Sequence, residues 1–186
     1  MPEAGLGTRL RGAAFDLYLV SINFLLKLPG HSFRLWVLRR LGGWKIGSGT
    51  IIDRGTVFMA RGGVSIGERC LINRGVTLDG RGGLSLGDFV NISPEVMCLT
   101  VDHNPDSQTF EGRFRPVVIG SRCWLATRAM VMPGSEIGDG VVVSAGAVVS
   151  GKVEDWSVMA GVPAVKIRER DPNAQASLPS PRRWFH

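Results

Sequence analysis

An aliphatic residue recurs every six positions along most of this chain. In chain order, the first position of each six holds Ile46, Ile52, Phe58, Ile66, Ile72, Leu78, Leu86, Ile92, Cys98, Ile119, Leu125, Val131, Ile137, Val143, Val149, Asp155, Gly161 and Ile167. Fifteen of these eighteen residues are aliphatic or Phe. The fifth position is small or β-branched, and it holds Thr50, Thr56, Gly62, Cys70, Val76, Gly82, Val90, Val96, Cys123, Ala129, Ser135, Val141, Ala147 and Val153. A period of six fits neither an α-helix nor an alternating strand, so it predicts a coil of short strands with one large and one small inward side chain each.

Two slips in this period repeat in register. The stretches RGGVSIG (61–67) and RGGLSLG (81–87) each add two residues, so the first three turns are offset by 20. A repeated addition of this kind predicts a bulged corner. The second position of each six often holds a residue that tolerates unusual corner backbone, as at Gly47, Asp53, Gly67, Asn73, Asp79, Gly87, Gly120 and Gly138. We therefore expect an all-β fold, a parallel β-helix of about six coils over residues 44–170, with stacked strands about 4.8 Å apart.

The period stops once, over residues 99–118. It is lost after Cys98 and resumes in phase at Ile119, which predicts a loop that projects from an uninterrupted core. This loop holds His103, one of three histidines in the chain. Loops are where functional residues concentrate, so His103 is a candidate for catalysis.

The three cysteines fall on inward positions of the period. Cys70 and Cys123 take the small inward position, and Cys98 takes the large one. Their odd number and their spacing indicate reduced thiols that pack in the core, rather than a disulfide framework or a metal site.

Residues 1–43 predict a helical extension before the β-helix. We expect one helix over 13–28, which polar residues interrupt and which is too short to span a membrane. A second helix is expected over 32–43, with Ser32 as its N-cap and Gly42 at its end.

Two roles are open for these helices: they cap the end of the coil or contact a subunit, or they touch a membrane surface through residues 13–41. At the other end of the chain, residues 171–186 are rich in Pro and Ser and predict a flexible tail.

The net charge of +6 is concentrated at the two ends of the chain. Residues 1–45 carry seven Lys and Arg against two acidic residues, and residues 164–186 carry five against two, whereas residues 46–163 carry ten against twelve. The basic ends are compatible with phosphate groups or an anionic surface. Nucleic-acid binding is not expected, because the β-helix itself is near neutral.

The stretch from residue 119 to 168 resembles the hexapeptide transferases, the left-handed β-helix acyltransferases that include maltose and galactoside O-acetyltransferases and enzymes that acetylate bacterial polysaccharides. The matching motifs are WLAT, MPGSEIG, VSAGAVVSGKV and AGVPAVKIR. The resemblance implies a left-handed coil, a homotrimer with each active site between two subunits, and acetyl-CoA as cosubstrate in a groove between coils. It also implies a cytoplasmic enzyme, with peripheral contact at the inner face of the membrane left open.

His103 matches the position of the catalytic histidine in that family. A neutral imidazole takes the proton of an attacking hydroxyl, which typically accelerates such a reaction by about 10²–10⁴-fold. The adjacent Asp102 faces the opposite side of an extended chain, so a backbone carbonyl is as good a candidate for orienting the ring.

The resemblance also implies the residues that hold acetyl-CoA. They are Thr127, whose amide faces the thioester, Ala145 and Gly146, which admit the pantetheine arm, Ser150 near the far end of the cofactor, and Lys166 and Arg168 at the nucleotide phosphates. Relatives can have Arg where this chain has Val165, so the phosphate contacts differ in part.

The resemblance implies that Asn73 and Asp79 line the acceptor pocket. For Trp124, two roles are open: it flanks the active-site groove, or it packs at a subunit contact. Asn73 and Asp79 also occupy corner positions of the repeat, so a purely structural role is equally open. Glu111, Arg113 and Arg115 of the loop are further candidates for contact with the acceptor.

These features predict an acetyl-CoA-dependent O-acetyltransferase that acts on a sugar or glycan hydroxyl by direct transfer. The alternatives are N-acetylation of an amino sugar, transfer from another acyl-CoA, and a β-helix scaffold without activity. A zinc hydratase of the same fold is excluded, because its three-histidine site cannot be built from His31, His103 and His186, so no metal is expected.

Overall fold

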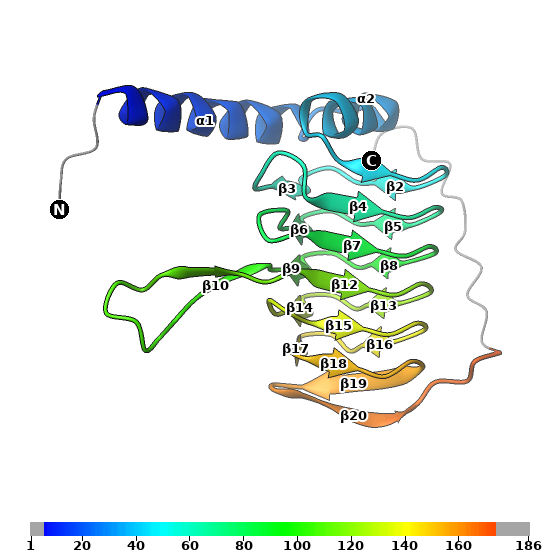
Figure 1. The fold of residues 1–186 in the computed structure, drawn as a ribbon. Helices are drawn as coiled ribbons and strands as arrows, with labels where there is room; N and C mark the ends of the chain where they lie inside the picture. Colours follow the sequence, from blue (N-terminus) through cyan, green and yellow to red (C-terminus); the bar gives the residue numbers. More distant parts are fainter. Residues whose placement is uncertain (1–5, 174–186) are drawn as a thin grey trace.

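A computed structural model describes residues 6–173 of the chain. Two helices lie at one end of a stack of short strands, the longer one extending well beyond the stack, and one hairpin projects from its side (Figure 1). The helices are α1 (Leu6–Leu25) and α2 (His31–Trp36), and a π-helical turn, η1 (Val37–Leu41), continues α2. The C-terminal segment 174–186, which holds most of the tail that the composition predicts to be flexible, lies outside the described residues.

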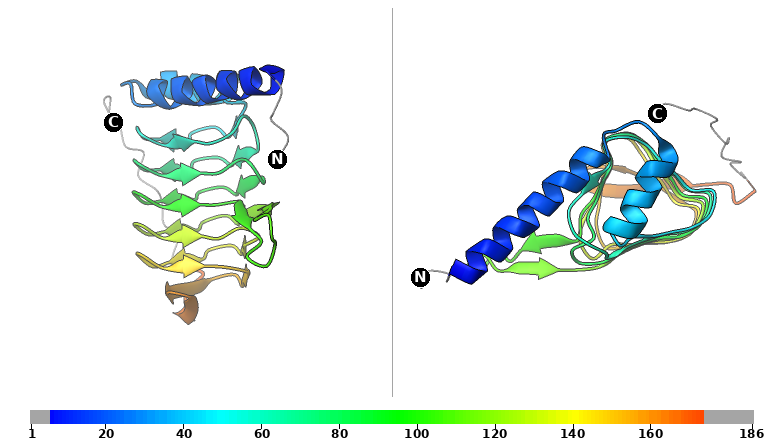
Figure 2. Two further views of the ribbon diagram at one scale, coloured as in Figure 1. Left: turned by 90° about the vertical axis from the view of Figure 1, so that its left-hand side faces the viewer. Right: turned by 90° about the horizontal axis from the view of Figure 1, so that it is seen from above.

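The strands form three parallel sheets that make the sides of the coil. The first consists of β1 (Lys45–Ile46), β4 (Val64–Ile66), β7 (Leu84–Leu86), β12 (Val117–Ile119), β15 (Glu136–Ile137) and β18 (Lys152–Val153). The second consists of β2 (Ile51–Ile52), β5 (Leu71–Ile72), β8 (Asn91–Ile92), β13 (Trp124–Leu125), β16 (Val142–Val143), β19 (Ser157–Gly161) and β20 (Ala164–Glu169). The third consists of β3 (Val57–Phe58), β6 (Thr77–Leu78), β9 (Met97–Cys98), β14 (Met130–Val131) and β17 (Val148–Val149). The predicted parallel β-helix of about six coils is thus confirmed, and its left-handed course can be followed in Figures 1 and 2.

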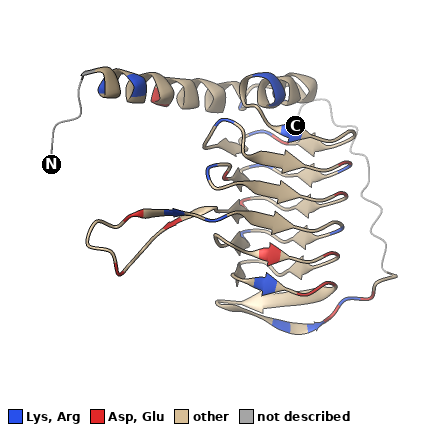
Figure 3. Cartoon of the chain, viewed as in Figure 1, with Lys and Arg blue, Asp and Glu red and all other residues tan. Residues whose placement is uncertain are grey.

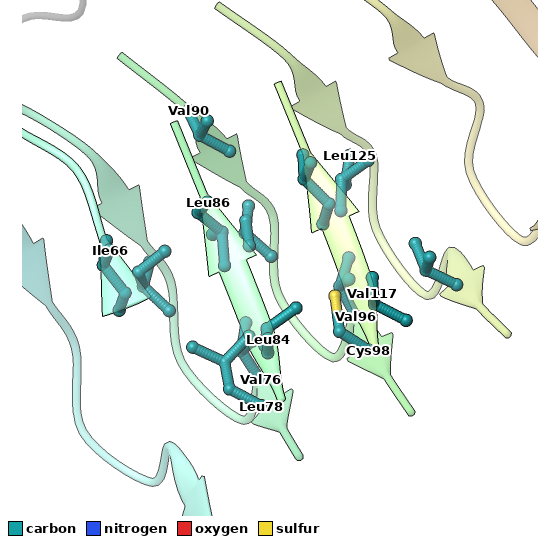
Figure 4. Close-up of a cluster of buried hydrophobic side chains, with 14 of the residues drawn as sticks. Ile66, Val76, Leu78, Leu84, Leu86, Val90, Val96, Cys98, Val117 and Leu125 are labelled. Carbon is teal, nitrogen blue, oxygen red and sulfur yellow. The ribbon is translucent and has the colours of Figure 1, made fainter. Parts of the chain in front are cut away.

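The strand register confirms the six-residue period. Ile46 pairs with Ile66, and Ile66 pairs with Leu86, which is the predicted offset of 20 residues. Leu86 then pairs with Ile119 across the interruption, so the coil resumes in phase. Figure 4 shows the inward side chains of these coils meeting in one continuous core.

The first position of each six is buried from Ile52 to Val149, and Ile46 is half-buried. The last three positions of the predicted period are wrong. Asp155 and Gly161 are exposed, and Ile167 is 58% exposed on β20. After Val149 the period slips by two residues, because Val153 pairs with Ile137 and Met159 pairs with Val143. The coil then ends where β20 runs antiparallel to β19 and forms a hairpin instead of another turn.

All three cysteines are free and buried in the core, as predicted. Burial raises the pKa of Cys98 to about 12 and that of Cys123 to about 12. These thiols therefore stay protonated at neutral pH, which fits a packing role.

The corner backbone differs from the prediction. At the regular corners, the residue with positive φ holds the fourth position of the six and not the second, as at Gly49, Gly55, Arg69, Gly75, Phe89, Glu95, Arg122, Arg128, Gly134, Gly140 and Gly146. Second-position glycines serve another purpose, because they let successive coils approach closely. A Cβ on Gly67 would lie 2.5 Å from the carbonyl oxygen of Gly87, and a Cβ on Gly47 would lie 2.5 Å from that of Gly67.

Polar side chains link the coils beside this glycine column. The carboxylate of Asp88 accepts the backbone N–H of Glu68 at 2.7 Å, and that of Asp139 accepts the N–H of Ser121 at 2.6 Å. Asp155 accepts the N–H of Asp139 at 2.8 Å in the same way. Each of these bonds requires the coils to stay at the short spacing that the glycines permit.

The N-terminal helices cap the first coil, one of the two roles that the sequence left open. Ile22 of α1 and Leu26 directly after it are buried, and the Asn23 side chain both donates to and accepts from the backbone of Phe58 at 2.9 Å. The buried Arg34 of α2 donates to the carbonyl oxygen of Ile52 at 3.1 Å. These bonds satisfy strand groups that have no preceding coil to pair with.

The boundaries of both helices differ from the prediction. Helix α1 begins at Leu6 and ends at Leu25, earlier than the predicted 13–28 at both ends. Helix α2 follows Gly30 and has no side-chain cap, so Ser32 is not its N-cap, whereas Gly42 ends the helical segment as predicted. None of the helices that the structure describes is both long and apolar enough to cross a membrane.

We predict that Gly67→Ala destabilises the coil by about 1–3 kcal/mol, because the added methyl group meets backbone of the next coil. Gly12→Ala is the matched control, since a Cβ there meets nothing within 4 Å and Ala favours the helix by about 1 kcal/mol. Urea unfolding followed by circular dichroism measures both. Equal midpoints for Gly67→Ala and the unaltered protein would contradict the role assigned to the glycine column.

Candidate active site

The predicted loop over residues 99–118 is an antiparallel hairpin. Its strands β10 (Val101–His103) and β11 (Gly112–Phe114) pair Asp102 with Arg113 and His103 with Gly112. The hairpin leaves the corner between the third and first sheets and extends away from the coil (Figure 1). Strand β12 already resumes the coil at Val117, two residues before the predicted Ile119.

His103 is exposed at the outer end of β10, and its ring is fixed by one hydrogen bond. Its Nδ1 lies 2.6 Å from the carbonyl oxygen of Phe110. A carbonyl oxygen only accepts hydrogen bonds, so Nδ1 carries the proton in the neutral ring. The lone pair is then on Nε2, which is the arrangement that a general base requires.

Asp102 takes no part in orienting His103, as the alternation of an extended chain suggests. It accepts two hydrogen bonds from Arg113, at 2.8 and 3.1 Å, and an ion pair with Arg115 reaches the same carboxylate. The Arg113 guanidinium holds the pKa of Asp102 below its usual range. Because Arg115 also lies against Gly134 of the next coil, this cluster braces the base of the hairpin against the β-helix.

Asp79 is fully buried at the corner one coil before the hairpin. Its carboxylate pairs with Arg81 at 2.9 and 3.0 Å and accepts the backbone N–H of Thr100 at 3.1 Å. Burial alone raises the pKa of Asp79, but the bonds from Arg81 and Thr100 outweigh it and hold that pKa below its usual value. In this conformation the carboxylate is occupied in holding Thr100, the residue directly before β10.

Four of the nine residues predicted to hold acetyl-CoA or the acceptor lie along another corner, between the second and third sheets. The backbone N–H of Gly146 donates to the carbonyl oxygen of Thr127 at 3.0 Å, which stacks the two residues on adjacent coils. Thr127, Ala145 and Gly146 are exposed there. Asn73 lies on the same corner two coils earlier, and its side chain donates to the carbonyl oxygen of Ile92 at 2.8 Å.

Trp124 and Lys166 lie beside this corner on the second sheet. The Trp124 ring is 46% exposed, and its Nε1–H donates to Ser93 at 3.0 Å. Lys166 pairs with Met159 in the last hairpin of the sheet and lies within 3.4 Å of Glu169. Arg168 is farther along β20, opposite Val158.

The structure does not bring all the predicted residues together in one chain. Ser150 follows β17 and lies on the hairpin's corner, not beside Gly146. His103 likewise projects from a different corner than Thr127 and Gly146. A single chain therefore presents a base at one corner and the candidate donor residues at another.

Two polar groups at the corner that holds Thr127 and Gly146, called the donor corner below, were not predicted from the sequence. Ser93 positions the Trp124 indole, and Glu95 forms an ion pair with Arg128 at 2.6 Å beside Thr127. Glu95 and Arg128 share the fourth position of the period, which turns both corners with positive φ. That shared position is the signal that could have placed them together.

A family model described as bacterial transferase hexapeptide (six repeats) matches residues 116–151, which span strands β12 to β17. This stretch of the chain carries the hexapeptide repeat that the family model describes. It is 46% identical over 79 residues to the putative colanic acid biosynthesis acetyltransferase WcaF of Escherichia coli K12, which covers 42% of this chain and 43% of WcaF. It is 48% identical over 65 residues to the putative lipopolysaccharide biosynthesis O-acetyl transferase WbbJ of the same organism, covering 35% of this chain and 32% of WbbJ. The chain thus matches less than half the length of these curated relatives.

Among solved structures, the chain is similar to the hexapeptide-repeat containing acetyltransferase VCA0836 of Vibrio cholerae, with a TM-score of 0.73 and 27% identity. The similarity covers 90% of this chain and 94% of VCA0836. A second structure of VCA0836, complexed with acetyl coenzyme A, has a TM-score of 0.69 at 23% identity and covers 91% of this chain and 94% of that one.

We predict that Asp79→Asn lowers stability at pH 7 by about 1–3 kcal/mol, because Arg81 and Thr100 lose a charged acceptor. A carboxylate with a lowered folded pKa contributes stability above its ordinary pKa of about 4 and loses it as pH falls through the folded pKa. The difference between the variant and the unaltered protein should therefore shrink below about pH 4. Urea midpoints measured from pH 7 to pH 2 test this, with Asp106→Asn at the exposed hairpin tip as control. A difference that stays constant over this range would contradict the assignment.

Proposed function

We propose that this hexapeptide-repeat protein is an acetyl-CoA-dependent O-acetyltransferase that acetylates a hydroxyl group of a sugar or glycan. The observation that carries the proposal is the contact of His103 Nδ1 with the Phe110 carbonyl oxygen, which leaves Nε2 as a base at the end of a braced hairpin. Similarity to WcaF and WbbJ supports a polysaccharide-related acceptor. The complex of VCA0836 with acetyl coenzyme A supports the donor.

In the proposed reaction, His103 Nε2 accepts the proton of the acceptor hydroxyl as its oxygen attacks the thioester carbonyl. The tetrahedral oxyanion then collapses, the C–S bond breaks, and the imidazolium returns the proton to the departing thiolate. The Phe110 carbonyl supports the cationic ring, because Nδ1–H donates to it throughout. Direct transfer needs no nucleophile from the protein, which is consistent with three buried, protonated thiols.

On the donor side, the exposed corner of Thr127, Ala145 and Gly146 would bind the pantetheine arm. The backbone N–H of Thr127 is the candidate donor to the oxyanion, and the small residues admit the arm close to the backbone. Lys166 at the end of the same sheet would meet the nucleotide phosphates. We leave Asp79 out of the acceptor contacts, since its carboxylate is enclosed and fully bonded.

The separation of His103 from the donor corner supports a site shared between chains. A copy placed beside the first can set its hairpin against the neighbour's Thr127 and Gly146, and three copies close such a ring. We therefore include a homotrimer in the proposal.

We predict that His103→Gln lowers turnover by about 10²–10⁴-fold, because no other group takes the proton of the hydroxyl. The assay follows thiol release from acetyl-CoA with a panel of hydroxyl and amino acceptors, and calorimetry checks that CoA binding is unchanged. His31→Gln, far from the hairpin at the start of α2, is the matched control and should keep its activity.

Three outcomes contradict the proposal. Turnover within tenfold of the unaltered protein would exclude His103 as the base. Acetylation of amino acceptors alone would make the protein an N-acetyltransferase. No thiol release with any acceptor would favour a scaffold without activity.

We predict that two inactive variants complement each other if the site is shared between chains. His103→Ala removes the base, and Ala145→Trp fills the donor corner, so each variant alone should be inactive. Co-expressed chains should recover part of the activity, because mixed assemblies contain some sites with both an intact hairpin and an intact corner. Absence of recovery in assemblies shown to be mixed would place the whole site within one chain.

A further inference from the structure

Helix α1 carries an exposed apolar row on the side that faces away from the coil. Leu10, Leu17, Val20 and Phe24 are 62–68% exposed, and their spacing places them on one face of the helix. The opposite face holds the buried Ile22 and packs on the first coil. The row therefore points outward from the end of the β-helix.

Helix α2 extends this row into a wider surface. Phe33 and Trp36 are exposed, and their rings stack with centroids 6.2 Å apart. Both helices lie at the same end of the coil, and the N-terminal part of α1 extends beyond it, as the side and top views show (Figures 1 and 2). We call this surface the apolar end face; its residues are Leu10, Leu17, Val20, Phe24, Phe33 and Trp36.

The segment that carries the apolar end face is also basic. Arg9 and Arg11 of α1, Lys27 in the turn after α1, and Arg39 and Arg40 of η1 are exposed, whereas Asp16 is the single acidic residue of residues 6–43. Figure 3 shows this basic character on the helices and a mixture of both signs along the coil. The positive charge of the described chain thus collects around its apolar end.

We propose that the apolar end face docks on the surface of an anionic phospholipid bilayer. Apolar and aromatic side chains on one helix face with flanking Lys and Arg are what an interfacial helix requires. The inner face of α1 is fixed to the coil through Asn23, so α1 already lies parallel to the plane that it would enter. Leu17, Val20 and Phe24 then insert at the boundary between headgroups and acyl chains.

The charge pattern selects an anionic membrane over a second copy of this chain. Packing two apolar end faces against each other would bring five exposed basic residues of each copy together, with only Asp16 of each to offset them. An anionic surface removes this repulsion and contributes attraction near each Lys and Arg. The docking does not depend on acetyl transfer, so it can hold or fail independently of the proposed activity.

The test is co-sedimentation of the full chain with vesicles of phosphatidylcholine alone, or of phosphatidylcholine and phosphatidylglycerol in equal parts. We expect binding to the anionic vesicles and weaker binding at high salt, because the basic residues are screened. Leu17→Ser combined with Phe24→Ser should lower the partition coefficient at least tenfold, since two large apolar groups no longer insert. Lys27→Gln and Arg40→Gln should each lower it about fivefold.

Val118→Ser is the matched control, because Val118 is 47% exposed on the side of the coil and should not alter binding. Equal partition of the Leu17/Phe24 double variant and the unaltered protein would overturn the proposal, as would failure of the unaltered protein to bind anionic vesicles. Light scattering is measured in parallel. A self-association that the double variant abolishes, without vesicle binding, would assign the apolar end face to a second copy instead.

Discussion

The short spacing between coils is the constraint on which the rest of this structure depends. Most strands of the coil are only two or three residues long, and they hold together because their backbone groups pair with the coil above or below. This pairing requires coils of nearly constant shape, which one large and one small inward residue per six provide. The glycine column and the aspartates beside it allow and fix the same approach at one corner.

The hairpin is compatible with this constraint because it enters and leaves the coil in phase. Leu86 and Ile119 pair as if the intervening excursion were absent, so the core on either side is continuous. The hairpin itself is stabilised locally, by the arginines on Asp102 and by Asp79 under Thr100. His103 thus stands on a rigid support even though its own side chain is exposed to solvent.

The features that repeat were predictable from the sequence, and those that occur once were not. The six-residue period located the core from Ile52 to Val149, because burial of inward residues imposes that spacing on the chain. The end of the coil was mispredicted, since the period slips by two residues between Val149 and Val153 and the β19–β20 hairpin then replaces a further turn. Helix boundaries failed for a related reason: Gly30 and the contacts with the first coil, not a capping residue, set the start of α2.

In the candidate site, too, some features followed from the sequence pattern and others did not. His103 could be identified because it lies in the loop that interrupts the period. The alternation of an extended chain also favoured a backbone carbonyl over Asp102 as the group that orients its ring. The burial of Asp79 could not be predicted, because the sequence pattern of a corner carboxylate is the same whether it binds a ligand or pairs with a neighbour such as Arg81. Ser93 acquires its contact with Trp124 only when residues 31 apart are stacked on adjacent coils.

The coil also sets fixed distances along its axis. Helix α1 rests on the first coil, and the hairpin leaves the third, two strand spacings or about 10 Å farther on. Adding or removing a whole 20-residue turn between them would shift the reach of His103 by about 4.8 Å and leave its own bonds intact. Proteins built in this way can adjust the height of a reactive group in fixed steps, without redesigning the group or its support.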